Sequence, residues 1–200
     1  MNQSLFTAVN TWLGSWYELA LELGPRSDDR LQAALTALWS YPDLEGCYLS
    51  PEKEPSDQPR VPATNYDDYS LLRGVARLPD GSHTACGSCV VREENGGSDW
   101  LDLYIPTGAL GNIYPSGTNP HRTQADCYGP QRDEIENWFA AIGLWVARSV
   151  SFQLGLIGDG VSGCVHAADV MREGIPTARR IGYLWPTGDS VVYHRRTEDW

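Results

Sequence analysis

The sequence predicts an α+β fold, with a largely antiparallel, twisted sheet and two main amphipathic helices packed on one of its faces. Several segments alternate apolar and polar residues, which is typical of strands. Short turn signals join neighbouring strands, so these strands must pair antiparallel. Two longer segments carry one apolar stripe at helical spacing, and such helices need one sheet face to cover. The 200 residues, 42% of them hydrophobic, are expected to form a single domain, 1–200.

The first strand and the first helix have clear local signals. Three alternating leucines within residues 15–23 predict a half-buried strand. A Gly-Pro pair ends it, and Ser27 is suited to cap the next helix because its side chain can accept a backbone N–H. The apolar stripe from Leu31 to Trp39 predicts that helix. Residues 1–13 fit either a helix or a strand.

The rest of the chain predicts further strands and a second main helix. A proline-rich surface loop is expected at 50–66 and an irregular stretch at 106–130. Pro130 opens the second helix, whose apolar stripe starts at Ile135, and a short helix is expected at 164–172. The sheet face away from the two main helices is expected to be solvated or available to a partner. The later strands are expected at 47–49, 71–78, 83–92, 100–105, 152–157, 179–185 and 190–194.

Charge and composition exclude several classes of partner. The net charge of −11 repels phosphate backbones and anionic lipid, so neither nucleic acid nor a membrane is expected as a partner. The same field favours association with a basic protein. The amino terminus lacks the basic region of a signal peptide, and the five cysteines are an odd number, which favours free thiols in a reducing cytoplasm. We therefore expect a cytoplasmic protein of bacterial type.

A glycine pattern is the most specific motif. Gly158, Gly160 and Gly163 match G-x-G-x-x-G and follow the apolar run 154–157. The pattern resembles the dinucleotide-binding βαβ fingerprint, in which glycines let the backbone approach a pyrophosphate. The resemblance implies a nucleotide or small molecule at these glycines, although residues 183–185 (Tyr-Leu-Trp) stand where the fingerprint has an acid. The alternative is a glycine-rich turn between a strand and a short helix.

Other reactive residue types give no catalytic or metal assignment. Cys86 and Cys89 form a C-x-x-C pattern, but within a strand they point to opposite faces, so ordinary strand cysteines are favoured and no metal site is assigned. The alternative is a small metal site at His83, Cys86 and Cys89. Asp99 and Asp102 are expected at the solvated edge of a strand. No catalytic residue and no cofactor is assigned.

The functional hypothesis that we favour is a non-enzymatic, acidic protein-binding domain with a basic protein partner. In character, though not by any motif, such a domain resembles immunity and inhibitor proteins. Tyr66, Asp67, Asp68 and Tyr69 form a candidate contact patch, because tyrosine offers rigid area and carboxylates offer charge complementarity. The alternative for this patch is a solvated loop. The alternative function is a nucleotide- or small-molecule-binding enzyme that uses the glycine turn at 158–163.

Overall fold

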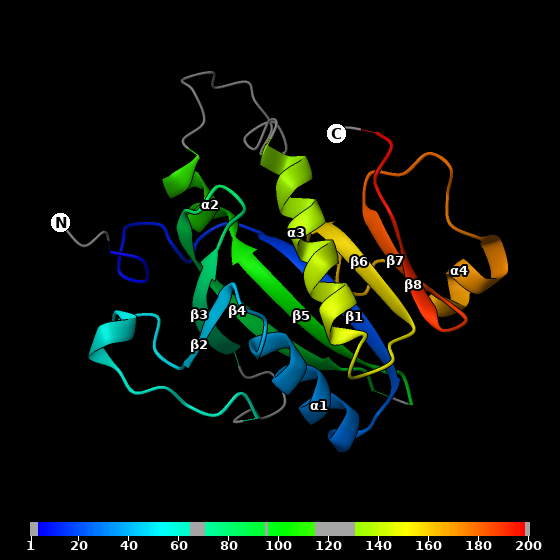
Figure 1. Cartoon of the computed structure of the whole chain (residues 1–200), viewed down its shortest axis with the longest axis horizontal. Helices are drawn as coiled ribbons and strands as arrows, with labels where there is room; N and C mark the ends of the chain where they lie inside the picture. The colour runs from blue at the N-terminus through cyan, green and yellow to red at the C-terminus, as the bar shows by residue number, and fades with distance from the viewer. Residues whose placement is uncertain (1–3, 65–70, 95, 115–130, 199–200) are drawn as a thin grey trace.

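The computed structural model describes residues 4–64, 71–94, 96–114 and 131–198 (Figure 1). Within these residues, none of the helices is long and apolar enough to cross a membrane. The strands are β1 (Trp16–Pro25), β2 (Leu44–Tyr48), β3 (Leu71–Arg77), β4 (His83–Arg92), β5 (Ser98–Pro106), β6 (Leu154–Asp159), β7 (Gly182–Thr187) and β8 (Ser190–His194). The helices are α1 (Asp28–Trp39), α2 (Thr107–Ile113), α3 (Gln131–Val146), α4 (Ala167–Glu173) and the short 3₁₀ helix η1 (Pro55–Asp57).

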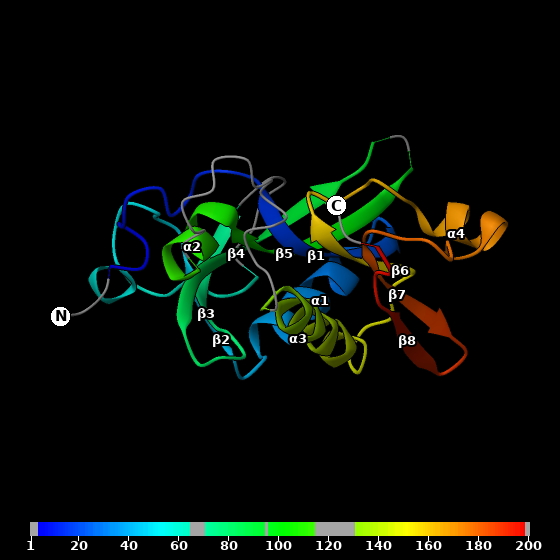
Figure 2. The ribbon, with the colours of Figure 1, turned by 90° about the horizontal axis from the view of Figure 1, so that it is seen from above.

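The eight strands of the described residues all belong to one sheet. Their order is β2-β3-β4-β5-β1-β6-β7-β8, and each neighbouring pair runs antiparallel. Figure 2 shows α1 and α3 together on one side of this sheet, where they also contact each other. The predicted α+β fold, with two main helices on one face of an antiparallel sheet, is therefore confirmed.

Strand β1 is central and is buried on both faces. It pairs with β5 on one side and with β6 on the other. Leu19, Leu21 and Leu23 join the main core beneath α1 and α3. On the opposite face, Glu18 and Glu22 are also almost fully buried. The expectation of a half-buried strand was therefore wrong, because the chain that follows β6 folds back over the second face.

Helix α1 begins and ends on specific contacts. Its N-cap is Ser27, as predicted, whose side chain accepts a hydrogen bond from the backbone N–H of Arg30. The Asp99 carboxylate accepts the N–H of Ser27 at 2.9 Å and so ties the start of the helix to β5. At the other end, the Trp39 ring lies over two glycines that face each other in β2 and β3, Gly46 and Gly74.

The face opposite α1 and α3 carries a smaller apolar cluster. Val161, Ala167 and Val170 pack there with Trp100 and Leu156. The expectation that this face is solvated therefore fails over this part of the sheet, because the segment between β6 and β7, including α4, covers it. A pocket lined by Glu18, Trp100 and Asp102 opens on the same face.

Two stretches differ from their expected structure. Residues 107–113 form α2 inside the stretch expected to be irregular, 106–130, whereas residues 115–130 lie outside the described part of the chain. Two glycines lower the helix propensity of α2, but Ala109 and Leu110 are buried, so packing outweighs propensity. Residues 4–13 form turns, neither a helix nor a strand.

The packing of the Trp39 ring against Gly74 gives a prediction about stability. A Cβ atom at Gly74 would overlap the Trp39 ring, so Gly74→Ala should lower the free energy of unfolding by about 1–3 kcal/mol. Gly111→Ala is the matched control, because nothing lies within 4 Å of its added Cβ. In the exposed part of α2 this control should raise stability by about 0.5–1 kcal/mol. Urea unfolding measures both, and equal effects would contradict the packing argument.

Candidate functional site

Two buried carboxylates lie close together on the face opposite α1 and α3. In the register of β1 and β5, Glu18 faces Tyr104 and Ala20 faces Asp102, so Glu18 and Asp102 are diagonal neighbours on that face. Glu18 is 2% exposed and Asp102 is 1% exposed. Within the described part of the chain, neither forms an ion pair with a basic side chain.

A cavity of about 550 Å³ opens onto these carboxylates, and we call it the carboxylate pocket. The indoles of Trp16 and Trp100, with Val91, supply its apolar surface, and Glu93 adds a third acid. None of the described residues that line it is basic. The full lining is Gly14, Ser15, Trp16, Glu18, Val91, Glu93, Trp100, Asp102, Gly160, Ser162 and Gly163.

Both indole rings are held in place by neighbours. The Trp16 ring stacks on Tyr104, with ring centroids 4.1 Å apart and planes 12° apart. The Trp100 ring meets His166 edge-on, and its N–H donates to Glu93 at 2.8 Å. The pocket is therefore bounded by rigid aromatic surfaces, which favour recognition of a shaped ligand.

Burial changes the acidity of Glu18. Its Oε1 atom accepts the backbone N–H of Ser162 at 2.9 Å. Burial nevertheless raises the pKa of Glu18 to about 7, and the charge of Asp159 adds to that increase against the hydrogen bonds from the turn. A carboxyl with a pKa near neutrality can exchange a proton under physiological conditions.

Asp102 is the less satisfied of the two acids. Burial raises its pKa well above the usual range, the nearby charge of Glu18 raises it further, and the Ser162 side chain opposes both effects. Its Oδ1 atom is buried and accepts no hydrogen bond from any residue in the described part of the chain. A buried acceptor beside an open cavity suits a donor supplied by a ligand.

The glycine turn forms one wall of the carboxylate pocket. Gly160 and Gly163 line it with positive φ angles of 59° and 70°, whereas Gly158 lies at the end of β6 against Val161 and Ile181. The strands on either side of the turn, β6 and β7, pair antiparallel, and a βαβ fingerprint joins parallel strands. The dinucleotide resemblance therefore does not extend to the topology, and ligand binding by these glycines stays a prediction.

Asp99 and Asp102 are not at a solvated edge, so that expectation was wrong. Strand β5 lies between β4 and β1, and both aspartates are almost fully buried. Sequence reasoning also missed Glu18. The available signal was two acids on the same face of the first predicted strand and one acid inside the strand predicted at 100–105, but their adjacency depends on pairing between segments that are far apart in the chain. The proposed patch of Tyr66, Asp67, Asp68 and Tyr69 lies outside the described residues.

The cysteine pair lies on two faces of β4, as expected. Cys86 belongs to the main core, and Cys89 is paired in register with Asp102 of β5. Burial raises the pKa of both thiols, which keeps them protonated and poorly reactive. Among the residues that the structure describes, no group of three or more His, Cys, Asp or Glu side chains could hold a metal ion.

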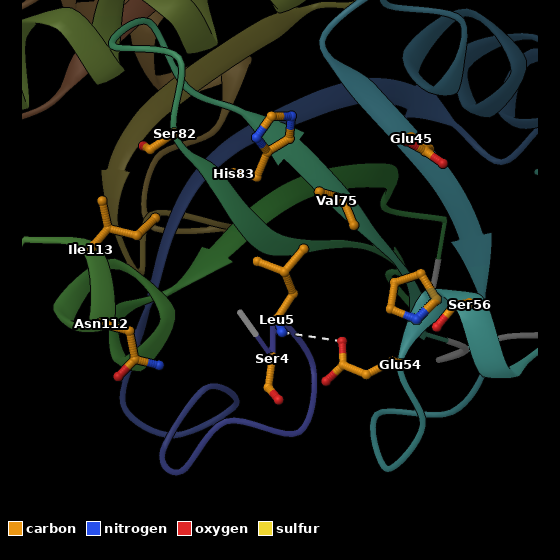
Figure 3. Close-up of a pocket in the computed structure, with 11 residues that line it drawn as sticks. Ser4, Leu5, Glu45, Glu54, Ser56, Val75, Ser82, His83, Asn112 and Ile113 are labelled. Atoms are coloured by element: carbon orange, nitrogen blue, oxygen red, sulfur yellow. Dashed lines mark hydrogen bonds between the residues drawn. The ribbon is translucent and has the colours of Figure 1, made fainter. Parts of the chain in front are cut away.

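A larger cavity lies elsewhere in the described part of the chain and has a different character (Figure 3). It measures about 750 Å³ and lies between Leu5 of the N-terminal segment, Val75, His83 and Ile113. One of its two acids, Glu54, accepts backbone N–H groups from residues 5–7, including that of Leu5 at 3.1 Å. Glu54 therefore tethers the N-terminal segment and has its acceptors filled, unlike Asp102.

Comparison with known proteins adds no assignment for this site. No family model, no curated protein and no solved structure matches the chain. The chemistry of the carboxylate pocket is therefore argued from its own residues.

The raised pKa of Glu18 predicts a pH-dependent effect on stability. The contribution of Glu18 to stability is fully present below its unfolded pKa of 4.5 and is lost as the pH rises through about 7. In Glu18→Gln the amide oxygen can still accept the N–H of Ser162. Relative to this variant, the free energy of unfolding of the wild-type protein should fall by about 3 kcal/mol between about pH 4 and pH 8. Urea unfolding across this range measures the difference. Glu52→Gln, which changes an exposed acid, is the control. If the free energy of unfolding changes with pH in the same way in the wild type and in Glu18→Gln, the prediction is contradicted.

Proposed function

We propose that this chain is a non-enzymatic binding domain for a basic protein, and that the carboxylate pocket receives a positively charged group of that partner. The observation that carries the proposal is the buried pair of Glu18 and Asp102, with one Asp102 oxygen that accepts no hydrogen bond from the described residues. Burying a carboxylate without a cation is unfavourable. A cationic group in the pocket would offset that cost for both acids.

Charge supports the choice of a basic partner. The net charge of −11 increases the encounter rate with a positively charged surface, and the acids of the pocket then provide a local contact. The same charges oppose phosphate groups, so nucleic acid is not a proposed partner. We also propose a cytoplasmic location, which is supported by the free thiols of Cys47, Cys86, Cys89 and Cys164 in the described part of the chain.

A second candidate function is an enzyme that acts on a neutral or cationic small molecule. Two observations favour it. Burial raises the pKa of Glu18 to about 7, which suits a general acid or base, and the glycine turn borders the same pocket. Both functions use Glu18 and Asp102, but only the enzyme would turn over its ligand. Persistence of the unmodified ligand after long incubation with the protein supports the binding domain.

The proposal predicts charge-dependent peptide binding at the carboxylate pocket. A short peptide rich in lysine and arginine should shift the NMR signals of the Trp16 and Trp100 indole N–H groups, because both rings line the pocket. A peptide of the same length with glutamine in place of each basic residue should not. Asp102→Asn should weaken binding about tenfold or more, since a charged hydrogen-bond partner is lost.

Glu52→Gln is the matched control, because it removes one negative charge at an exposed position outside the pocket. It should change the affinity by less than about twofold, as expected for an isolated surface charge. Asp102→Asn replaces a buried acid by an amide of similar shape and should remain folded, which its thermal unfolding curve would verify. Equal affinity of the two variants, or no indole shift with the basic peptide, would overturn the proposal.

A further inference from the structure

We infer that the group bound in the carboxylate pocket is the guanidinium of an arginine side chain on the basic partner. This inference rests on the proposed function and names the ligand of the same site. It is carried by three features of the pocket: acceptors on two separate strands, the flat indole surface of Trp16, and an apolar wall beside it.

The acceptors suit a ligand with several donors in a fixed plane. Glu18 belongs to β1 and Asp102 to β5, so the two carboxylates approach the pocket from different strands. The backbone of Ser162 already engages Glu18, while Asp102 keeps an oxygen without a partner among the described residues. A guanidinium presents five N–H donors in a planar fork and can reach both carboxylates at once. An ammonium is a more compact charge on a flexible stem.

The aromatic surfaces also favour a planar cation. The stacking on Tyr104 holds the partly exposed Trp16 ring in place, so a guanidinium can stack on it without reorganising it. The Trp100 ring is 1% exposed and serves as the fixed floor of the pocket. A guanidinium is more weakly hydrated than an ammonium, which lowers the cost of moving it against apolar walls. The protein already uses the same contact elsewhere, since Arg148 lies over the Trp145 ring at 5.1 Å.

The remaining space suits the stem of an arginine side chain. The cavity of about 550 Å³ is larger than a guanidinium group alone, and Val91 with Trp16 gives it apolar surface. Methylene groups of a long cationic side chain can cover such surface while the charged head meets the carboxylates. A basic protein surface around that arginine would also be attracted by the net charge of −11.

The test compares peptides that differ at one residue. One short basic peptide is made with arginine, lysine or citrulline at its centre, where citrulline is the neutral isostere of arginine. Measured by calorimetry, the dissociation constant of the arginine peptide should be about fivefold or more lower than that of the lysine peptide. It should be about tenfold or more lower than that of the citrulline peptide. Lysine binding as tightly as arginine would overturn the guanidinium inference, while the proposed function would stand. If neither cation binds, the proposed function fails as well.

Two further experiments test whether the guanidinium must belong to a peptide and whether it stacks on the Trp16 indole. N-acetyl-arginine methylamide should bind at the same two indoles, about tenfold or more weakly than the arginine peptide. If it bound as tightly as the arginine peptide, a free small molecule would suffice as the ligand. The inference that the guanidinium belongs to a protein partner would then be contradicted. Trp16→Leu should reduce the preference for arginine over lysine, and Trp16→Phe should restore most of it. An unchanged preference in Trp16→Leu would contradict stacking on this ring.

Discussion

The carboxylates on the second face of β1 are the constraint on which much of the structure depends. Glu22 accepts the backbone N–H of Ala167 at 2.7 Å and the hydroxyl of Ser98 at 2.7 Å. Glu18 accepts the N–H of Ser162. Because buried carboxylates need such donors, these bonds fix where the chain after β6 crosses the sheet and where α4 starts. The wall of the carboxylate pocket is therefore a consequence of two acids in the central strand.

The opposite face of β1 explains why this arrangement has only one register. Its leucines pack beneath α1 and α3, and the Tyr17 hydroxyl donates to Glu136 of α3 at 2.6 Å. Arg132 donates to the same Glu136, so the buried acid has a cationic partner on its own helix. A shift of β1 by one residue would move the leucines to the pocket side and the glutamates under the helices. Because the leucines must face the core, the register of β1 is fixed, and the same register places Glu18 at the pocket.

The strands and main helices could be predicted because their signals are local. Alternation along β1, the cap at Ser27 and the stripe of α3 each depend on residues within a few turns of chain. The carboxylate pocket could not be predicted from the sequence, because Glu18 and Asp102 come together only through the pairing of β1 with β5. An acid at the solvated edge of a sheet and an acid in its interior have the same local pattern. Helix α2 was missed because tertiary burial, rather than propensity, stabilises it.

The position of the acids within the second face bears directly on what that face does. Beside them, Leu154 and Leu156 close the same face with apolar side chains, so the fold accommodates hydrophobic packing there. Replacing buried charges by apolar groups of similar volume often increases stability. A chain that instead carries Glu18 and Asp102 at these positions forgoes that stability in the free state. The cation that we propose as the ligand would return part of it, which is the relation between stability and function expected of a recognition site.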